Sequence, residues 1–333
     1  NTGGGVEAGD TPRTLWNTPV PRPVGGSGVV RGVDGGMTPR VADWLVPSVT
    51  PTPGTPVPPV VPFPTRISEH SAPKRLPFLR LLGPVDLENV PDIDHGARTR
   101  LTELTAYLAI NPGVDRRHLD DALWPNRAQA DISQAREAAI TRLGDWLAAT
   151  PGVEGALLHE DGATLSLDGR VTTDWDLWTG LLPDGPQEAS DARLEQALGL
   201  VRGRPFIGTH PRQFAWAEGP KQMMVAAVVD AAAELARRCI DTQRYDDAID
   251  AALVGLTVEP AVERLWRLRI VAADRAGQPD VRDEAVSALV TLCEAAGGRF
   301  EPETVRLLDD LRARTAPDGS ILAPATSRSA EVV

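Results

Sequence analysis

The chain has 333 residues and a formal charge of −12 at pH 7, from 34 Lys and Arg against 46 Asp and Glu. Hydrophobic residues make up 42% of it, which is enough for real cores and excludes a wholly disordered chain. Two cysteines cannot cross-link a secreted scaffold, and no run of about 20 apolar residues is present to span a membrane. Because a signal peptide is also lacking, we expect a cytoplasmic location. The chain begins at Asn1 rather than Met, so an upstream membrane anchor stays open.

The first 76 residues are rich in proline and glycine. Residues 1–77 hold 15 of the 30 prolines and 11 of the 30 glycines, and residues 47–64 cannot form a helix or a central strand. The glycine clusters are not followed by the Gly-Lys-Ser/Thr of a phosphate-binding loop. Residues 1–76 are therefore predicted to be a disordered linker arm, and residues 315–333 a disordered tail.

Residues 77–173 show the element order of a winged helix-turn-helix. Residues 78–87 read as a strand, a Gly-Pro turn and a second strand, and the apolar spacing predicts helices over residues 100–110, 115–125 and 131–149. Two short strands, residues 156–159 and 164–167, follow across Asp161-Gly162, which is a strong hairpin signal. The predicted class of this domain is α+β.

Residues 174–314 are predicted to be an all-helical domain. Seven helices are expected, over residues 175–182, 189–202, 213–240, 245–257, 261–276, 281–295 and 302–314. Tyr245, Ala248, Ala252 and Pro260 come close to a tetratricopeptide register, in which small residues let paired helices approach. Trp175 and Trp178 stand where the first domain meets the second, and we expect them to form the contact between the two.

Several ordered motifs resemble those of SARP-type regulators. Leu81-Leu82-Gly83-Pro84-Val85, residues 108–113, residues 119–125 and Ile140-Thr141-Arg142-Leu143 resemble their winged helix. Asp174-Trp175-Asp176-Leu177-Trp178, residues 197–206, Tyr245-Asp246-Asp247-Ala248 and Glu259-Pro260 resemble the bacterial transcriptional activator domain that follows it. The resemblance implies an OmpR-like winged helix whose third helix enters the major groove of DNA. It also implies a helical domain for homodimerisation and contacts with a protein partner.

The charge of the winged helix does not favour DNA binding. Residues 77–182 carry 9 Lys and Arg against 17 Asp and Glu, a balance of −8, whereas DNA affinity rests mostly on neutralising phosphates. Two hypotheses therefore remain. In the first, the chain is a regulator that binds DNA weakly and needs dimerisation or a partner. In the second, the winged helix has lost DNA binding and is a tethered protein-interaction module. One form of this hypothesis makes the chain the cytoplasmic end of a larger, membrane-anchored protein.

The DNA hypothesis names particular residues. On a helical projection of the third helix, the outward side carries Ser133, Gln134, Glu137, Thr141 and Asp145, with two arginines on its flanks. The candidates for base contacts are Gln134, Thr141 and Arg142, since Gln binds adenine with good geometry. The candidates for phosphate contacts are Arg136, Arg116 and Arg117.

An enzyme finds little support in the sequence. The five histidines show no helical metal-pair spacing, and Asp92-Ile93-Asp94-His95 is interpreted as a solvated turn rather than a metal site. Asp120 and Asp121 do not converge on a helix and are interpreted as a solvated face, and Cys239 and Cys293 as reduced, buried helix residues. We expect no catalytic residue, no metal and no cofactor.

Overall fold

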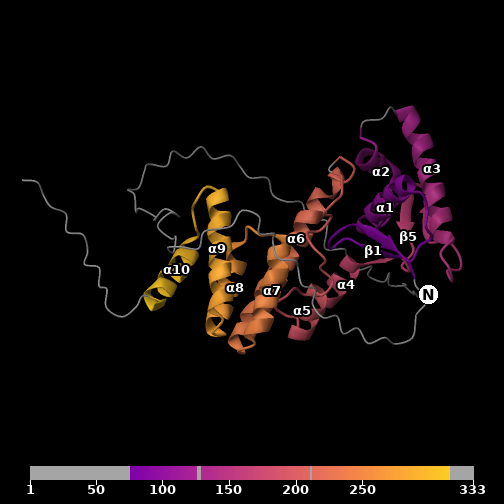
Figure 1. Ribbon diagram of the computed structural model, residues 1–333. Coiled ribbons are helices and arrows are strands. Elements are labelled where there is room, and N and C mark those ends of the chain that lie inside the picture. Colours follow the sequence, from indigo (N-terminus) through magenta and orange to yellow (C-terminus); the bar gives the residue numbers. More distant parts are fainter. Residues whose placement is uncertain (1–75, 126–128, 211, 316–333) are drawn as a thin grey trace, which may run out of the picture. The chain divides into compact units, whose positions relative to one another are not determined.

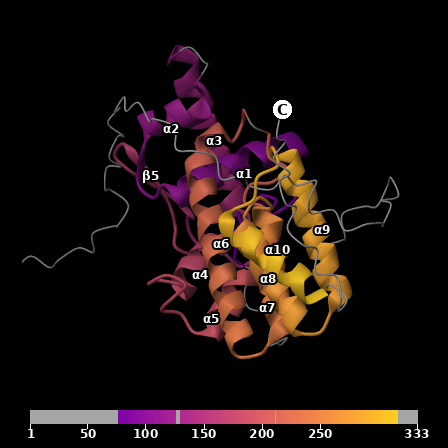
Figure 2. The same cartoon turned by 90° about the vertical axis from the view of Figure 1, so that its left-hand side faces the viewer.

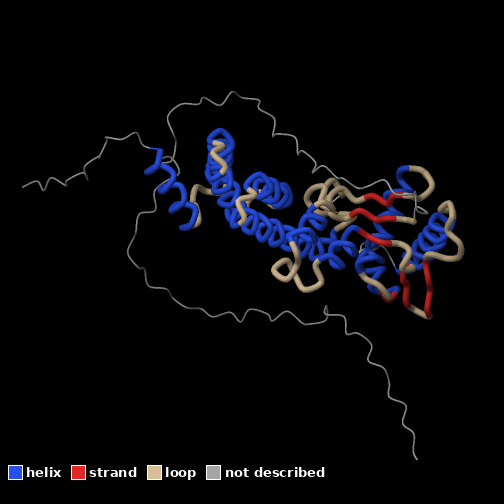
Figure 3. Tube along the Cα trace, turned by 90° about the horizontal axis from the view of Figure 1, so that it is seen from below, coloured by secondary structure: helices blue, strands red, loops and turns tan. Residues whose placement is uncertain are grey.

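The computed structural model describes residues 76–125, 129–210 and 212–315. The predicted arm (residues 1–76) and tail (residues 315–333) lie outside these residues, apart from one residue of each. Every strand of the described residues precedes Asp174, and the regular elements after it are all helices (Figure 3). The predicted fold class is therefore confirmed: a mainly helical chain with an α+β part followed by an all-helical part.

Residues 76–173 are here called the head and residues 174–315 the helical half. A single cluster of buried apolar side chains runs from Leu79 in the head to Leu311 in the helical half. The predicted division into two domains at residue 174 stays a prediction, because this apolar core is continuous across it. None of the described helices has the length and apolar character needed to cross a lipid bilayer.

Two small sheets frame the head. In the first, β1 (Phe78–Arg80) pairs with β2 (Asp86–Glu88) antiparallel and with β6 (Thr172–Thr173) parallel. The second has the order β3-β5-β4, formed by β3 (Val114–Asp115), β4 (Leu158–Asp161) and β5 (Thr164–Leu167). The sequence predicted β1, β2 and the β4–β5 hairpin, although β4 begins two residues later than expected. β3 and β6 were not predicted, because two residues carry no detectable alternation.

Three helices complete the head: α1 (His95–Ile110), α2 (Arg116–Leu123) and α3 (Gln129–Ala148) (Figure 1). The Asp94 carboxylate accepts a hydrogen bond from Ala97 N at 3.2 Å and so caps α1, and Asp115 caps α2 in the same way. α1 therefore begins five residues before the predicted Arg100. The motif around Asp94 and His95 is a helix start, and the part of the chain that the structure describes holds no group of potential metal ligands.

The helical half is a series of antiparallel helices, in which α6 to α9 lie side by side (Figure 2). Its helices are α4 (Asp174–Leu181), α5 (Asp191–Leu198), α6 (Glu218–Asp241), α7 (Tyr245–Val258), α8 (Glu263–Arg275), α9 (Pro279–Ala295) and α10 (Pro302–Thr315). The helix predicted from Gln213 begins at Glu218, after a short 3-10 helix, Ala215–Ala217. The predicted small residues of the tetratricopeptide register are buried, among them Ala232, Ala236, Ala248 and Ala252.

α7 approaches α6 and α8 closely at Gly255. A Cβ at this position would lie 2.6 Å from Leu265 Cδ1 and 2.9 Å from Ala232 Cβ. The Ala232 Cβ is fixed to the backbone, so rotation of a side chain cannot relieve this second contact. We expect Gly255→Ala to lower the free energy of unfolding by about 1–3 kcal/mol, although alanine is the better helix former.

Gly180 in α4 provides the control for this prediction, because its added Cβ would meet nothing within 4 Å. Gly180→Ala should raise the free energy of unfolding by about 0.5–1 kcal/mol. Urea denaturation of both variants measures the difference. A Gly255→Ala protein as stable as the Gly180→Ala protein would contradict the close approach of the three helices.

The loop after β1 is held by residues of the helical half. The Leu81 and Leu82 backbone N–H groups donate to the Asp174 carboxylate at 2.8–3.0 Å. On the other side of the loop, the Leu82 carbonyl accepts from Arg202 N at 2.7 Å and the Leu81 carbonyl from Phe206 N at 3.2 Å. We call this arrangement the clamp. It joins three of the motifs that carry the family resemblance.

Gly83 lets the clamp close. Its φ is +148°, and a Cβ there would lie 2.9 Å from Arg202 Cβ. The Arg202 guanidinium also donates to the Pro84 carbonyl at 2.9 Å. The Leu-Leu-Gly-Pro motif is thus a docking loop as well as a turn.

Trp175 and Trp178 stack on α4, with ring centroids 6.1 Å apart and an interplanar angle of 13°. Trp178 is 3% exposed and belongs to the continuous apolar core, and the half-buried Trp175 packs against that core. Their predicted role as the contact between two domains stays a prediction.

Candidate nucleic-acid interface

The outer side of α3 is open to solvent. α3 buries Ile132, Ile140, Leu143, Trp146 and Leu147, and it packs on α1 and β4. Its opposite side exposes a mixed row of side chains: Asp131, Ser133, Gln134, Glu137, Ala138, Thr141, Arg142 and Asp145. The helical projection from the sequence correctly placed Ser133, Gln134, Glu137, Thr141 and Asp145 on this side, because the spacing of 3.6 residues per turn fixes which residues share a face. Of the two arginines predicted on the flanks, Arg142 is exposed and Arg136 is mostly buried.

The three predicted base-contacting residues lie on this exposed side. Gln134 and Thr141 form no side-chain hydrogen bond to any described residue, and Arg142 has no ion pair among them. Gln134 and Thr141 stand seven residues apart, so they lie two turns from each other on the same side of α3. All three groups are therefore open for contacts with an external surface.

Arg136 is engaged inside the head. Its Nη1 lies 2.5 Å from Asp120 Oδ2 and its Nε lies 3.2 Å from Glu137 Oε1. The side chains of Arg136 and Asp120 are 13% and 6% exposed. The interpretation of Asp120 as a solvated residue was therefore wrong, because its carboxylate is buried as the partner of Arg136. The ion pair joins α2 to α3, and a phosphate contact by Arg136 would require it to open.

Arg116 is engaged as well. Its guanidinium pairs with the Glu160 carboxylate in the β4–β5 hairpin and donates to the Gly162 carbonyl at 2.8 Å. Its Nε also lies 3.8 Å from Glu137 Oε1. Arg116 thereby ties the hairpin, which is the wing of the fold, to α2. Arg117 differs, because its side chain is exposed and has no ion pair within the described part of the chain.

The base of the wing is closed by an ion-pair cluster. Asp168 Oδ1 accepts from Arg170 Nε at 2.6 Å, and Asp168 Oδ2 lies 3.0 Å from His159 Nε2. Arg170 and His159 hold the pKa of Asp168 well below its usual range. Arg170 is thus engaged within the wing. Of the six predicted site residues, Arg117 and Arg142 remain as cations without an ion pair among the described residues.

The two cysteines are buried and reduced, as expected. Burial raises the pKa of Cys239 to about 11, so its thiol is protonated at neutral pH and a poor nucleophile.

Glu103 on α1 is a residue that the sequence analysis did not single out. Its side chain is buried, at 8% exposed, and burial raises its pKa to about 7, although Gln213 and Trp216 favour the charged form. Trp216 also packs edge-on against Tyr107, with ring centroids 5.0 Å apart. The buried Nε1 of Trp216 has no hydrogen-bond partner of normal geometry among the described residues. The only feature of the sequence that could have indicated this buried carboxyl is its place between the apolar residues Leu101 and Leu104.

This geometry defines a winged helix-turn-helix with an open third helix, joined through a clamp to stacked helical hairpins. Residues 179–296, in the helical half, match the family model of the bacterial transcriptional activator domain. None of the curated proteins compared with the chain matches it.

A solved structure shares the fold. The chain is similar to Mycobacterium tuberculosis EmbR, solved in complex with a low-affinity phosphopeptide, with 21% sequence identity and a TM-score of 0.53. The match covers 72% of this chain and 66% of EmbR, so just under two thirds of that protein's length is represented. The resemblance to SARP-type regulators is thus confirmed in the activator domain and in the fold.

Proposed function

We propose that the chain is a regulator of transcription, without catalytic activity, whose α3 binds DNA in the cytoplasm. The observation that carries this proposal is the open outer side of α3, which no element of the helical half covers within the described residues. The matched activator domain supports the regulatory role. A second role of the helical half, to form a homodimer or bind a protein partner, follows from that family and belongs to the same proposal.

The side chains exposed on α3 are suited to bind DNA weakly while distinguishing between bases. The Gln134 amide has the geometry to bind adenine through two hydrogen bonds, and the Thr141 hydroxyl and Arg142 guanidinium lie on the same side. Of the predicted phosphate contacts, Arg117 has no ion pair among the described residues, and Arg142, a predicted base contact, brings a second unpaired positive charge to the DNA. With about two counterions displaced by these two charges, log Kobs should fall against log salt with a slope of about −2, roughly a tenfold loss between 50 and 200 mM.

Arg142→Ala is the variant that tests this docking. We expect it to weaken binding about 5- to 30-fold and to bring the salt slope closer to zero by about 1. Duplexes are first selected from a randomised pool with the full chain, and affinity is then measured by fluorescence anisotropy over a salt series. Arg306→Ala on α10 is the control, because that arginine is 71% exposed and pairs with Glu303 in its own helix.

Two results would contradict the proposal. If Arg142→Ala and Arg306→Ala bind the selected duplex equally well, α3 is not the contact surface. If the full chain selects no duplex at 50 mM salt, DNA is not its target.

A second candidate function is a protein-interaction module. The observation that favours it is the engagement of Arg116 and Arg136 by carboxylates of the head, together with the exposed Asp131, Glu137 and Asp145 on α3. Such a face would attract a basic protein segment rather than a phosphate backbone. The absence of a selected duplex, combined with salt-sensitive binding of a Lys-rich peptide that Asp145→Asn weakens, would support this candidate over DNA.

A further inference from the structure

A cavity of about 580 Å³ lies between the head and the segment that leads into α6. Its apolar part is formed by Leu101 and Leu104 of α1 together with Leu123 and Trp124 at the end of α2. Alanines 135, 138 and 139 of α3 form the opposite wall and leave the space open, because their side chains are short. The volume falls within the range of about 300–1,000 Å³ that is typical of small-molecule sites.

Three arginines line the same cavity: Arg100 from α1, Arg142 from α3 and Arg212 from the segment before α6. All three side chains are exposed, and none forms an ion pair or a side-chain hydrogen bond with another described residue. Two other arginines of the head, Arg116 and Arg136, are by contrast paired with carboxylates. The cavity is therefore a positive site on an acidic chain.

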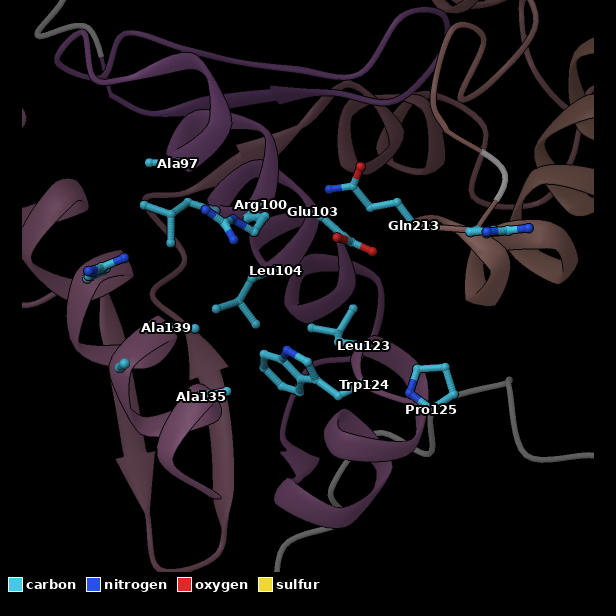
Figure 4. A pocket seen from close by; sticks show the side chains of 14 residues that line it. Ala97, Arg100, Glu103, Leu104, Leu123, Trp124, Pro125, Ala135, Ala139 and Gln213 are labelled. Atoms are coloured by element: carbon cyan, nitrogen blue, oxygen red, sulfur yellow. The ribbon is translucent and has the colours of Figure 1, made fainter. Parts of the chain in front are cut away.

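One buried carboxyl group completes the polar lining. Glu103 lies beside Gln213, while Leu104, Leu123 and Trp124 form a separate group (Figure 4). Glu103 is more than nine-tenths buried, and no arginine pairs with it. The Gln213 side chain favours the charged form of Glu103, so this carboxyl has a donor within the protein and requires none from a ligand.

We infer that this cavity binds a small organic acid with a flat apolar body. Its carboxylate is attracted by the positive charge of Arg100 and Arg212, and its body packs on Leu104, Leu123 and Trp124. Because Arg212 and Gln213 precede α6, the occupant contacts both the head and the helical half. The inference does not depend on DNA binding, because Arg100 and Arg212 are not among the proposed DNA contacts.

The test uses 2-naphthoate and its uncharged analogue 2-naphthamide, titrated into the full chain by isothermal calorimetry. We expect 2-naphthoate to bind with a Kd below about 1 mM and 2-naphthamide to bind at least about tenfold more weakly, because charge-assisted hydrogen bonds are lost. Arg100→Gln and Arg212→Gln should each weaken 2-naphthoate binding about 5- to 10-fold. Neither residue is among the proposed DNA contacts, so the outcome is separate from that of the duplex experiment.

Two variants complete the design. Arg306→Gln is the control and should bind 2-naphthoate like the parent chain. Ala138→Phe places a large side chain at the exposed end of the cavity and should abolish binding, and its thermal unfolding curve checks that the fold is intact. Absence of 2-naphthoate binding at 5 mM would overturn the inference. So would equal binding of the acid and the amide, or full affinity in the two cavity arginine variants.

Discussion

Replacing Asp174 by alanine is expected to lower the free energy of unfolding by about 3–5 kcal/mol. The Asp174 side chain is 0% exposed, and its two oxygens accept from the Leu81 and Leu82 N–H groups. Burial raises its pKa, and the two N–H donors and Arg202 act in the opposite direction. Alanine would leave two buried N–H groups without an acceptor and would leave a cavity beside them.

Asp176→Ala is the matched control, because this residue lies on the same helix but at the surface. Its carboxylate accepts from Thr173 N at 2.9 Å as part of the capping box of α4. Loss of a cap should reduce the free energy of unfolding by about 1 kcal/mol. Guanidinium denaturation compares the two variants. If Asp174→Ala were no more destabilising than Asp176→Ala, the clamp would contribute little to holding the head on the helical half.

Replacing Glu103 by glutamine is expected to stabilise the protein at pH 8 by about 2–3 kcal/mol and to have almost no effect near pH 4. The pKa of Glu103 is about 7 in the folded protein, against an ordinary value of 4.5. Between these values the folded chain binds more protons than the unfolded chain, so the free energy of unfolding falls as the pH rises. Above pH 7 the buried carboxylate is charged and its full cost is present. Glutamine keeps the shape and removes that charge.

Urea denaturation of both proteins at pH 5.0 and pH 8.0 measures this effect as a difference. Other groups, such as Asp168, titrate in both proteins and cancel from the comparison. Glu188→Gln is the control, since its side chain is exposed and the substitution should change stability by less than about 0.5 kcal/mol at either pH. A difference between Glu103→Gln and the parent chain that does not vary with pH would contradict the burial of this carboxyl.

Local signals predicted most of the fold. Caps, turns and apolar spacing are properties of neighbouring residues, and they placed β1, β2, the wing hairpin and seven of the ten described α-helices within two residues of their observed bounds. α1 and α6 begin five residues from their predicted starts, and the helix predicted over residues 189–202 ends at Leu198 because the chain turns there to reach the clamp. The partners that fix β3, β6 and Asp174 lie about 50 to 95 residues away in the sequence, so no local pattern could indicate them.

For the candidate site, the sequence predicted which side chains of α3 face outward, but not which arginines form ion pairs. A helical projection correctly placed Gln134 and Thr141 on the exposed side and Arg142 on its flank, because direction depends only on spacing along α3. It could not show that Glu160, 44 residues from Arg116, would neutralise that arginine, since this contact depends on how the wing folds back. The same limit hid Glu103, whose polar partners, Gln213 and Trp216, lie in the helical half.

Hydrogen–deuterium exchange of the full chain, with and without a saturating selected duplex, tests most directly that α3 is the surface with which this protein reads DNA. The account predicts slower exchange in residues 131–145 of α3 and in residues 158–164 of the wing, with little change in α6 to α9. Protection confined to α6–α9, or none in α3 at saturation, would contradict it.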